Sequence, residues 1–222
     1  MRMSSISTDL TIKIENVSKK FEDQQVLDHV NLYCESGSIT GIMGRNGTGK
    51  SVLFKCICDF LKVDEGTILI NGQQNSDYIR KECKIGATIE EPAFLKQYSG
   101  IKNLELLYII RNKADKNKLI RTMQQVGLDP DLKKSVGKYS MGMKQRLAIA
   151  QAIMEEQNIL LFDEPMNGLD SDGIEQIKKL FYNLKEQGRI ILIASHNRDD
   201  LEEICDSIYE MKKRNLHLIY SK

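Results

Sequence analysis

The stretch that most constrains this chain is residues 44–51, which fits the pattern G-x-x-x-x-G-K-[ST] of a phosphate-binding loop. Glycines let the backbone turn tightly and bring N–H groups close to phosphate oxygens, where a Cβ would obstruct them. Lys50 is expected to place its charge on the β- and γ-phosphates, and the Ser51 hydroxyl to bind Mg²⁺. The residues expected to bind nucleotide phosphate are Gly44, Arg45, Asn46, Gly47, Thr48, Gly49, Lys50 and Ser51.

The flanks of this loop agree with a phosphate-binding role. Residues 38–43 have the apolar pattern of a short buried strand, and residues 51–57 that of a helix. A helix in this place points its positive dipole end and its unpaired N–H groups at the same anion. A glycine-rich turn without a ligand is the alternative, and the strand and helix flanks favour the phosphate-binding loop.

Length and composition favour one globular domain over residues 1–222. The 222 residues are 41% hydrophobic, enough for a sizeable core, and they contain a single phosphate loop and no visible repeat. A net charge of +1 gives no electrostatic case for nucleic acid as a partner. No signal peptide and no apolar run long enough to cross a bilayer is visible, so we expect a cytoplasmic chain.

The cysteines are odd in number and scattered, which favours reduced core thiols over disulfides. The C-x-C pair at residues 56–58 has the wrong spacing for a zinc site and falls on the helix after the loop. The five cysteines are Cys34, Cys56, Cys58, Cys83 and Cys205.

Patterning along the chain predicts an antiparallel start, a helical middle, and buried strands towards the end. Strands are expected at 10–15, 26–32, 67–72 and 85–89, a mostly helical region at 101–126, a helix at 143–154, buried strands at 159–162 and 190–194, and a hairpin at 206–220. Phe21 lies between the first two of these strands. It is either a core aromatic or a flat surface on which adenine stacks.

Two carboxylates follow the apolar run at 159–162, which has the character of a strand buried on both faces of a parallel sheet. Ligands bind at the carboxyl ends of such strands. Asp163 and Glu164 are either solvated loop residues or, behind a phosphate loop, a Mg²⁺-positioning group and the base for an attacking water. The run at 190–194 ends near His196, which is either a structural histidine or, at the end of a buried strand parallel to the one that bears the acids, a group that can reach the γ-phosphate.

With these residues placed, the chain resembles the ATP-binding subunit of an ABC transporter over nearly its full length. Residues 44–51 are similar to the Walker A motif and residues 159–163 to Walker B, with Glu164 in the place of the catalytic glutamate. Residues 167–170 resemble the D-loop, and His196 the switch histidine.

Further positions match the same family. Residues 139–143 stand in the place of the signature motif, and Phe21 matches the aromatic A-loop position. The signature keeps Ser140 and Gly142, the groups that the resemblance assigns to a partner's γ-phosphate, but has methionine at the positions of glycine and glutamine. Glu90 stands where the family has the Q-loop glutamine, and its oxygen is expected to ligate Mg²⁺ directly or through water.

The resemblance implies a P-loop NTPase fold: a three-layer α/β core with a mostly parallel sheet, an N-terminal antiparallel β subdomain, and a helical subdomain inserted at about residues 92–146. It implies that Lys50, Glu164 and His196 act in ATP hydrolysis with Mg²⁺. It also implies a dimer, as a homodimer or with a paralogous subunit, that works with integral membrane permease subunits. The chain would then lie peripherally on the inner face of the cell membrane.

A narrower likeness is to the bacitracin- and lantibiotic-export type of bacterial subunit. It rests on residues 89–92 together with residues 139–146. Two alternatives stand beside transport: a non-transport ABC ATPase, and a nucleotide-binding regulator without catalysis. The lysine, serine, carboxylates and histidine expected for hydrolysis are all present, which favours an enzyme over the regulator.

Overall fold

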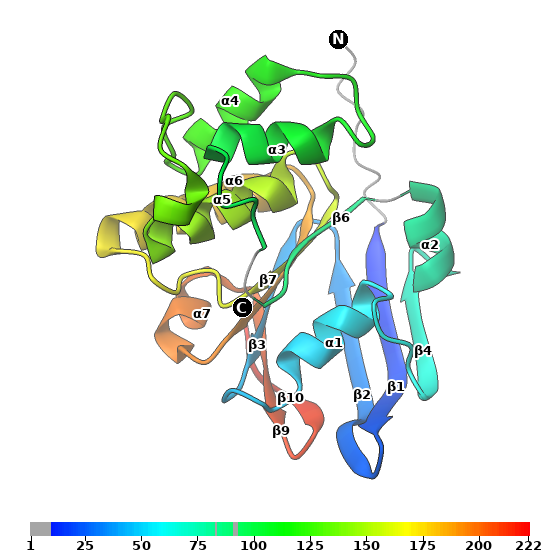
Figure 1. Cartoon of the computed structure of the whole chain (residues 1–222). Helices are drawn as coiled ribbons and strands as arrows, with labels where there is room; N and C mark the ends of the chain where they lie inside the picture. Colours follow the sequence, from blue (N-terminus) through cyan, green and yellow to red (C-terminus); the bar gives the residue numbers. More distant parts are fainter. Residues whose placement is uncertain (1–9, 83, 91–92) are drawn as a thin grey trace.

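Two β-sheets organise the chain in the computed structural model, which describes residues 10–82, 84–90 and 93–222 (Figure 1). A four-stranded sheet has the order β2-β1-β4-β5, and a six-stranded sheet the order β10-β9-β3-β8-β7-β6. Glu91 and Pro92, where we expect the fourth strand to have ended and the helical subdomain to begin, lie outside the described residues, as does Cys83.

The four-stranded sheet is antiparallel and is built mainly from the first part of the chain. Its strands are β1 (Thr11–Phe21), β2 (Gln24–Glu35), β4 (Glu65–Ile70) and β5 (Gln73–Gln74). Register shifts interrupt the pairing of β1 with β2 after Ile14 and break the alternation of buried and exposed residues. Both strands therefore continue beyond the segments that their alternating patterns predict. Phe21 is the last residue of β1 rather than part of a loop.

The six-stranded sheet has a parallel centre and an antiparallel edge. β3 pairs in parallel with β8 and β9, and β7 pairs in parallel with β6 and β8. The strands are β3 (Ser38–Met43), β6 (Ile85–Thr88), β7 (Ile159–Asp163), β8 (Ile190–Ser195), β9 (Ser207–Lys212) and β10 (Asn215–Ser221). The carboxyl ends of the parallel strands therefore meet at one edge, where the phosphate loop follows β3.

Helices cover both faces of this sheet. α1 packs on one face, together with β1, β2 and β4, and α5, α6 and α7 pack on the other (Figure 1). The helices are α1 (Lys50–Ile57), α2 (Asn75–Glu82), α3 (Gly100–Tyr108), α4 (Lys116–Gln125), α5 (Met141–Ile153), α6 (Ser171–Glu186) and α7 (Arg198–Ile204). The P-loop NTPase fold expected from the sequence is confirmed: a layered α/β core with an antiparallel N-terminal sheet.

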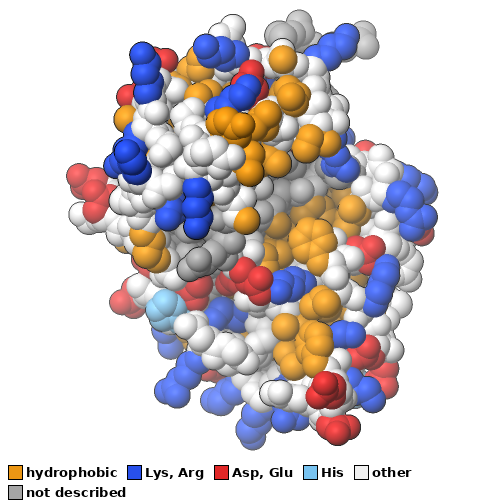
Figure 2. Space-filling model, in the orientation of Figure 1, with side chains coloured by type: hydrophobic (Ala, Val, Ile, Leu, Met, Phe, Trp, Pro, Cys, Tyr) orange, Lys and Arg blue, Asp and Glu red, His pale blue; other side chains and the backbone are white. Residues whose placement is uncertain are grey.

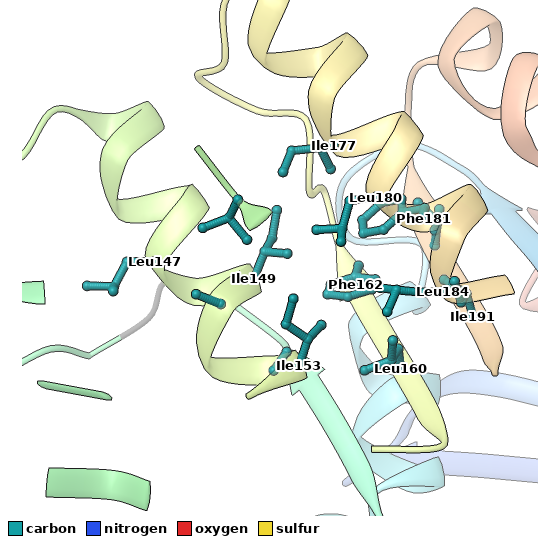
Figure 3. Close-up of a cluster of buried hydrophobic side chains, with 14 of the residues drawn as sticks. Leu147, Ile149, Ile153, Leu160, Phe162, Ile177, Leu180, Phe181, Leu184 and Ile191 are labelled. Carbon is teal, nitrogen blue, oxygen red and sulfur yellow. The ribbon is translucent and has the colours of Figure 1, made fainter. Parts of the chain in front are cut away.

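β7 shows why four apolar residues in a row predict a strand buried on both faces. Leu160 and Phe162 point into the cluster formed with α5 and α6, while Ile159 and Leu161 pack on the side of α1. Phe162 stacks on Phe181 of α6 with ring centroids 4.6 Å apart (Figure 3). Burying one such side chain contributes about 1.5–3 kcal/mol, so this cluster holds α6 firmly on the sheet.

The helices in the middle of the chain and the cysteines can be compared with the sequence predictions. The helical region holds α3 and α4, and α5 begins two residues earlier than the periodicity predicts because the Ser140 hydroxyl accepts the N–H of Met143 at 3.2 Å. Cys34, Cys56, Cys58 and Cys205 are buried free thiols, as expected. Over the described ranges, no helix has both the length and the hydrophobicity that crossing a bilayer requires.

Candidate ATP-binding and hydrolysis site

The phosphate loop turns sharply between β3 and α1. Gly49 adopts φ 109°, and a Cβ on it would lie 3.1 Å from the carbonyl oxygen of Val26, so a side chain here would be both strained and crowded. Because Gly49 caps α1 without a side chain, the first N–H groups of the helix remain free to face an anion. Lys50 is buried, and its ammonium group donates to the carbonyl oxygen of Gly44 at 2.6 Å.

Ser51 and Asp163 meet across the site. The Ser51 hydroxyl donates to Oδ2 of Asp163 at 2.5 Å. Burial raises the pKa of Asp163, and the hydrogen bond from Ser51 and the charge of Lys50 partly oppose that shift. A hydroxyl beside a carboxylate is an oxygen donor pair of the kind that Mg²⁺ prefers, so the two residues fit the ion. The described residues hold no cluster of three or more His, Cys, Asp and Glu for a metal. A magnesium ion here would complete its shell with phosphate and water.

Glu164 is held by groups from β8 and from the residue after it. Its Oε1 accepts the backbone N–H of His196 at 3.1 Å and lies 2.9 Å from Nδ1 of the same histidine. Its Oε2 accepts the Ser195 hydroxyl at 3.2 Å. Lys50 Nζ lies 3.7 Å from Oε1, which brings the loop lysine and the carboxylate into one site. The sequence predicted Glu164 and His196 as separate members of this site but missed Ser195.

Phe21 borders the same cavity as the phosphate loop. The cavity encloses about 840 Å³ and is lined by residues that include Phe21, Val26, Gly47, Lys50, Ser51, Glu90, Gln145, Asp163 and Glu164. Phe21 is 42% exposed, which excludes the core-aromatic interpretation. Its position leaves a ring available for a base, and the volume lies in the range of small-molecule sites.

Glu90 lines the cavity but its carboxylate is engaged by a lysine. Oε1 of Glu90 lies 2.5 Å from Nζ of Lys55, which is on α1 one turn after Ser51. Glu90 therefore approaches the site, and its charge contributes to raising the pKa of Asp163, while an ion pair occupies one of its oxygens. Lys55 was not among the residues predicted for the site, although its place one helical turn after Ser51 puts it on the same face of α1.

The signature residues lie at the start of α5, where Met141 lines the same cavity as the phosphate loop. Ser140 is exposed and caps the helix, and Gly142 packs against the turn that follows β7. A Cβ on Gly142 would come within 2.6 Å of the carbonyl oxygen of Gly168. Met141, which replaces a glycine of the family pattern, is 65% exposed. This end of α5 thus borders the cavity through Met141 and leaves Ser140 exposed to solvent.

Fold and site together define a P-loop ATPase: a glycine loop leading into a helix, a lysine, a serine–aspartate pair, and a second carboxylate held by a histidine at the carboxyl edge of a parallel sheet.

Comparisons with known proteins are more specific. A family model described as ABC transporter matches residues 27–167. An uncharacterised ABC transporter ATP-binding protein of Bacillus subtilis is 36% identical over 95% of this chain and 99% of its own length. The bacitracin transport ATP-binding protein of Enterococcus faecalis is 36% identical over 94% of this chain and 68% of its own length.

Solved structures agree. A dimeric bacterial ABC transporter cassette has a TM-score of 0.84 at 25% identity, covering 93% of this chain and 96% of its own. An ABC transporter component from Clostridium perfringens has a TM-score of 0.80 at 28% identity, covering 95% and 88%. The chain belongs to the ABC transporter family. It is an ATP-binding, ATP-hydrolysing subunit of that family, which uses ATP with Mg²⁺ and works as a dimer with membrane components.

Proposed function

We propose that this chain powers an exporter that removes a peptide antibiotic of the bacitracin or lantibiotic kind, and that it lies on the inner face of the cell membrane, bound to permease subunits. Relatives named as bacitracin and lantibiotic transport ATP-binding proteins, at 32–36% identity over 89–94% of this chain, support the substrate class. The observation that carries the ATPase role is the approach of Lys50 and His196 to the same oxygen of Glu164.

The roles of the site residues follow from where each side chain lies. Phe21 stacks on adenine, and residues 44–51 surround the phosphates with N–H groups. Lys50, already inside the loop, neutralises phosphate charge. Ser51 and Asp163 hold Mg²⁺, with Glu90 in the adjacent position. The bound ion supplies charge neutralisation at the β- and γ-phosphates.

Glu164 acts as the base that orients and polarises the attacking water. Its carboxylate faces the loop lysine and is fixed by Ser195 and His196, so its direction is set before the nucleotide arrives. His196, which contacts the same carboxylate, steadies the γ-phosphate. Phosphoryl transfer needs chiefly positioning and charge stabilisation, which this arrangement provides.

Two copies enclose two ATP molecules about a two-fold axis in this proposal. Ser140 and Gly142 of one copy contact the γ-phosphate held by the other, an arrangement supported by the exposure of Ser140 at the start of α5. Hydrolysis then waits for the second copy, and dimer closure is coupled to nucleotide binding.

The proposal also treats the chain as one domain over residues 1–222, with a helical subdomain at about 92–146.

Membrane subunits dock beside the cavity. Hydrophobic side chains gather over α3 and in the hollow below it (Figure 2). Phe60, just past the end of α1, is 72% exposed, and Ile110, just past α3, is 73% exposed. A contiguous patch of exposed apolar side chains on a protein surface marks an interaction site. Phe60 follows α1, the helix that bears both Lys50 and Lys55, so a partner bound here would contact the helix that starts at the phosphate loop.

The test of the ATPase role replaces Glu164 with glutamine, which keeps the shape and removes the base. Glu164→Gln should retain ATP with Mg²⁺, hydrolyse it at a small fraction of the wild-type rate, and accumulate as a dimer on size-exclusion chromatography. Normal turnover in this variant would remove Glu164 from the mechanism. Glu202→Gln, an exposed carboxylate on α7 paired with Arg198, is the matched control and should behave as wild type.

The substrate class is tested in cells that co-produce the chain and its membrane subunit. Wild type should raise the concentration of bacitracin or of a lantibiotic needed to stop growth, and Glu164→Gln should not. Equal sensitivity with and without the wild-type pair would contradict the antibiotic-export assignment and leave the ATPase role untouched.

A further inference from the structure

Gln145 connects α5 to the backbone of Glu164. Its side-chain Nε2 donates to the carbonyl oxygen of Glu164 at 3.3 Å. The glutamine is half-buried and lines the same cavity as the carboxylate. It lies a little over one turn from Ser140, the residue that caps this helix. One helix therefore bears both a signature serine and a bond to the chain's own hydrolytic glutamate.

The backbone at Glu164 needs such support. Glu164 adopts φ 50°, a left-handed conformation that non-glycine residues hold only where surrounding contacts enforce it. Its N–H donates to Ala194 at 2.8 Å, and its carbonyl oxygen also accepts the N–H of Asn167 at 3.2 Å. Because the side chain leaves from this residue, a rotation of the Glu164 peptide redirects the carboxylate. Gln145 is the contact that links that peptide to α5.

A second contact joins the same two segments. Gly168, in the turn after Glu164, approaches the start of α5 so closely that a Cβ on it would lie 2.7 Å from a side-chain carbon of Met141. The start of α5 and the turn at residues 164–170 are thus bound together by a hydrogen bond and by close packing.

We propose that Gln145 is a positioning residue for Glu164 that makes the signature end of α5 and the carboxylate of the chain's own site turn as one unit. When Ser140 contacts nucleotide bound to the second copy, α5 tilts, and the hydrogen bond from Gln145 moves the backbone of Glu164 with it. Binding at one site therefore changes the position of the carboxylate in the other. This inference rests on the proposed function, because it takes Glu164 as the hydrolytic base and Ser140 as the contact to the second copy.

The experiment compares Gln145→Met, which keeps length but removes the donor, with Gln145→Glu, which replaces the donor by an acceptor. Gln151→Met, on the same helix about 9 Å further along, is the matched control. Loss of one hydrogen bond predicts a fall in kcat of about three- to tenfold, with ATP affinity unchanged. The Hill coefficient for ATP should fall from near two towards about one. Hydrogen exchange in a peptide spanning residues 163–170 should quicken.

The outcomes separate this inference from the proposed function. Wild-type kcat and Hill coefficient in both Gln145 variants would overturn it, and so would a lower kcat with an unchanged Hill coefficient and unchanged exchange. Equal effects in Gln151→Met would also overturn it, since they would report on the helix and not on the bond. If Glu164→Gln hydrolyses ATP normally, the proposed function fails, while the exchange of residues 163–170 still shows whether Gln145 holds that backbone.

Discussion

His196 and Glu164 contact each other directly, with Nδ1 of the histidine 2.9 Å from Oε1 of the glutamate. The two residues follow adjacent parallel strands, β8 and β7, so their proximity is a product of sheet pairing. The backbone N–H of His196 also donates to the same oxygen, so part of the contact survives any change of the imidazole. The histidine therefore fixes the glutamate directly, and in the proposed mechanism it also steadies the γ-phosphate.

Removing the Phe21 ring should weaken ATP binding. Base–aromatic stacking contributes about 1–3 kcal/mol, so Phe21→Ala should raise the Kd for ATP about five- to 150-fold. Phe21→Trp keeps a ring and should bind near the wild-type level. Titration calorimetry in the Glu164→Gln background checks both. Inorganic tripolyphosphate has no base, so its affinity should not change in Phe21→Ala; an equal loss would show that the loop, and not stacking, was damaged.

Sharing of sites between subunits predicts recovery from two inactive variants. Lys50→Ala removes the loop charge, and Ser140→Arg blocks the surface offered to the partner, so each variant alone should be nearly inactive. In a mixture of equal parts, half of the dimers are mixed and each has one complete site, which predicts about a quarter of wild-type activity. The steady-state ATPase rate against mixing ratio measures it. A mixture as inactive as its components would contradict the shared site.

The ion pair of Lys55 and Glu90 predicts a change in magnesium dependence. Lys55→Met should release the Glu90 carboxylate towards the ion and lower the Mg²⁺ concentration needed for half-maximal ATP binding. Exposed ion pairs contribute about 0.2–1 kcal/mol, so the change should be at most about fivefold. Binding is measured without turnover in the Glu164→Gln background. Adding Glu90→Gln should abolish the gain, and a gain that persisted would show that Glu90 is not the ligand.

The buried thiols should be unreactive at neutral pH. Burial raises the pKa of Cys34, Cys58 and Cys205 to about 12 and that of Cys56 to about 11. Only the thiolate is nucleophilic, and a pKa of 12 leaves on the order of one thiol in 10⁴ ionised at pH 8. Iodoacetamide should therefore label these four positions in unfolded but not in native protein, as read by peptide mass spectrometry. Native labelling at the unfolded rate would contradict this burial.

The same shifts set the direction of the stability change in alkali. The unfolded thiols ionise near their ordinary pKa of 9.0, below the folded values. The contribution of these groups to stability is therefore complete below about pH 9 and is lost as the pH rises towards about 12. Urea unfolding at a series of pH values above 9 should show a falling free energy of unfolding.

Local patterns predicted most of the elements that build the site. The apolar runs before Asp163 and His196 identified β7 and β8 because strands buried on both faces need four or more apolar residues in sequence. The spelling of residues 44–51 predicted a phosphate loop because only glycine permits its turns. The two strands and the loop each depend on a few neighbouring residues, so the local sequence is enough to predict them.

The pairings between distant residues were beyond such patterns. Nothing near Lys55 in the sequence points to Glu90, which lies 35 residues further on. The amphipathic pattern predicts only that Gln145 lies on the polar side of a helix. Its contact with Glu164 depends on the position of α5 beside the turn after β7, which the local sequence does not show. The register shifts in β1 and β2 also arise from pairing, which extended both strands beyond their alternating segments.

Gly86 of β6 lies so close to α5 that a Cβ would sit 1.9 Å from the carbonyl oxygen of Ala152. The two backbones are in direct contact there, so any side chain at position 86 would have to displace α5, the helix that Ser140 caps and that bears Gln145. Position 86 should consequently tolerate replacement as poorly as the loop lysine does, for a reason of packing alone. A scan of all single substitutions should therefore find Gly86 among the positions where activity is lost, although it has no reactive group and contributes only by being small.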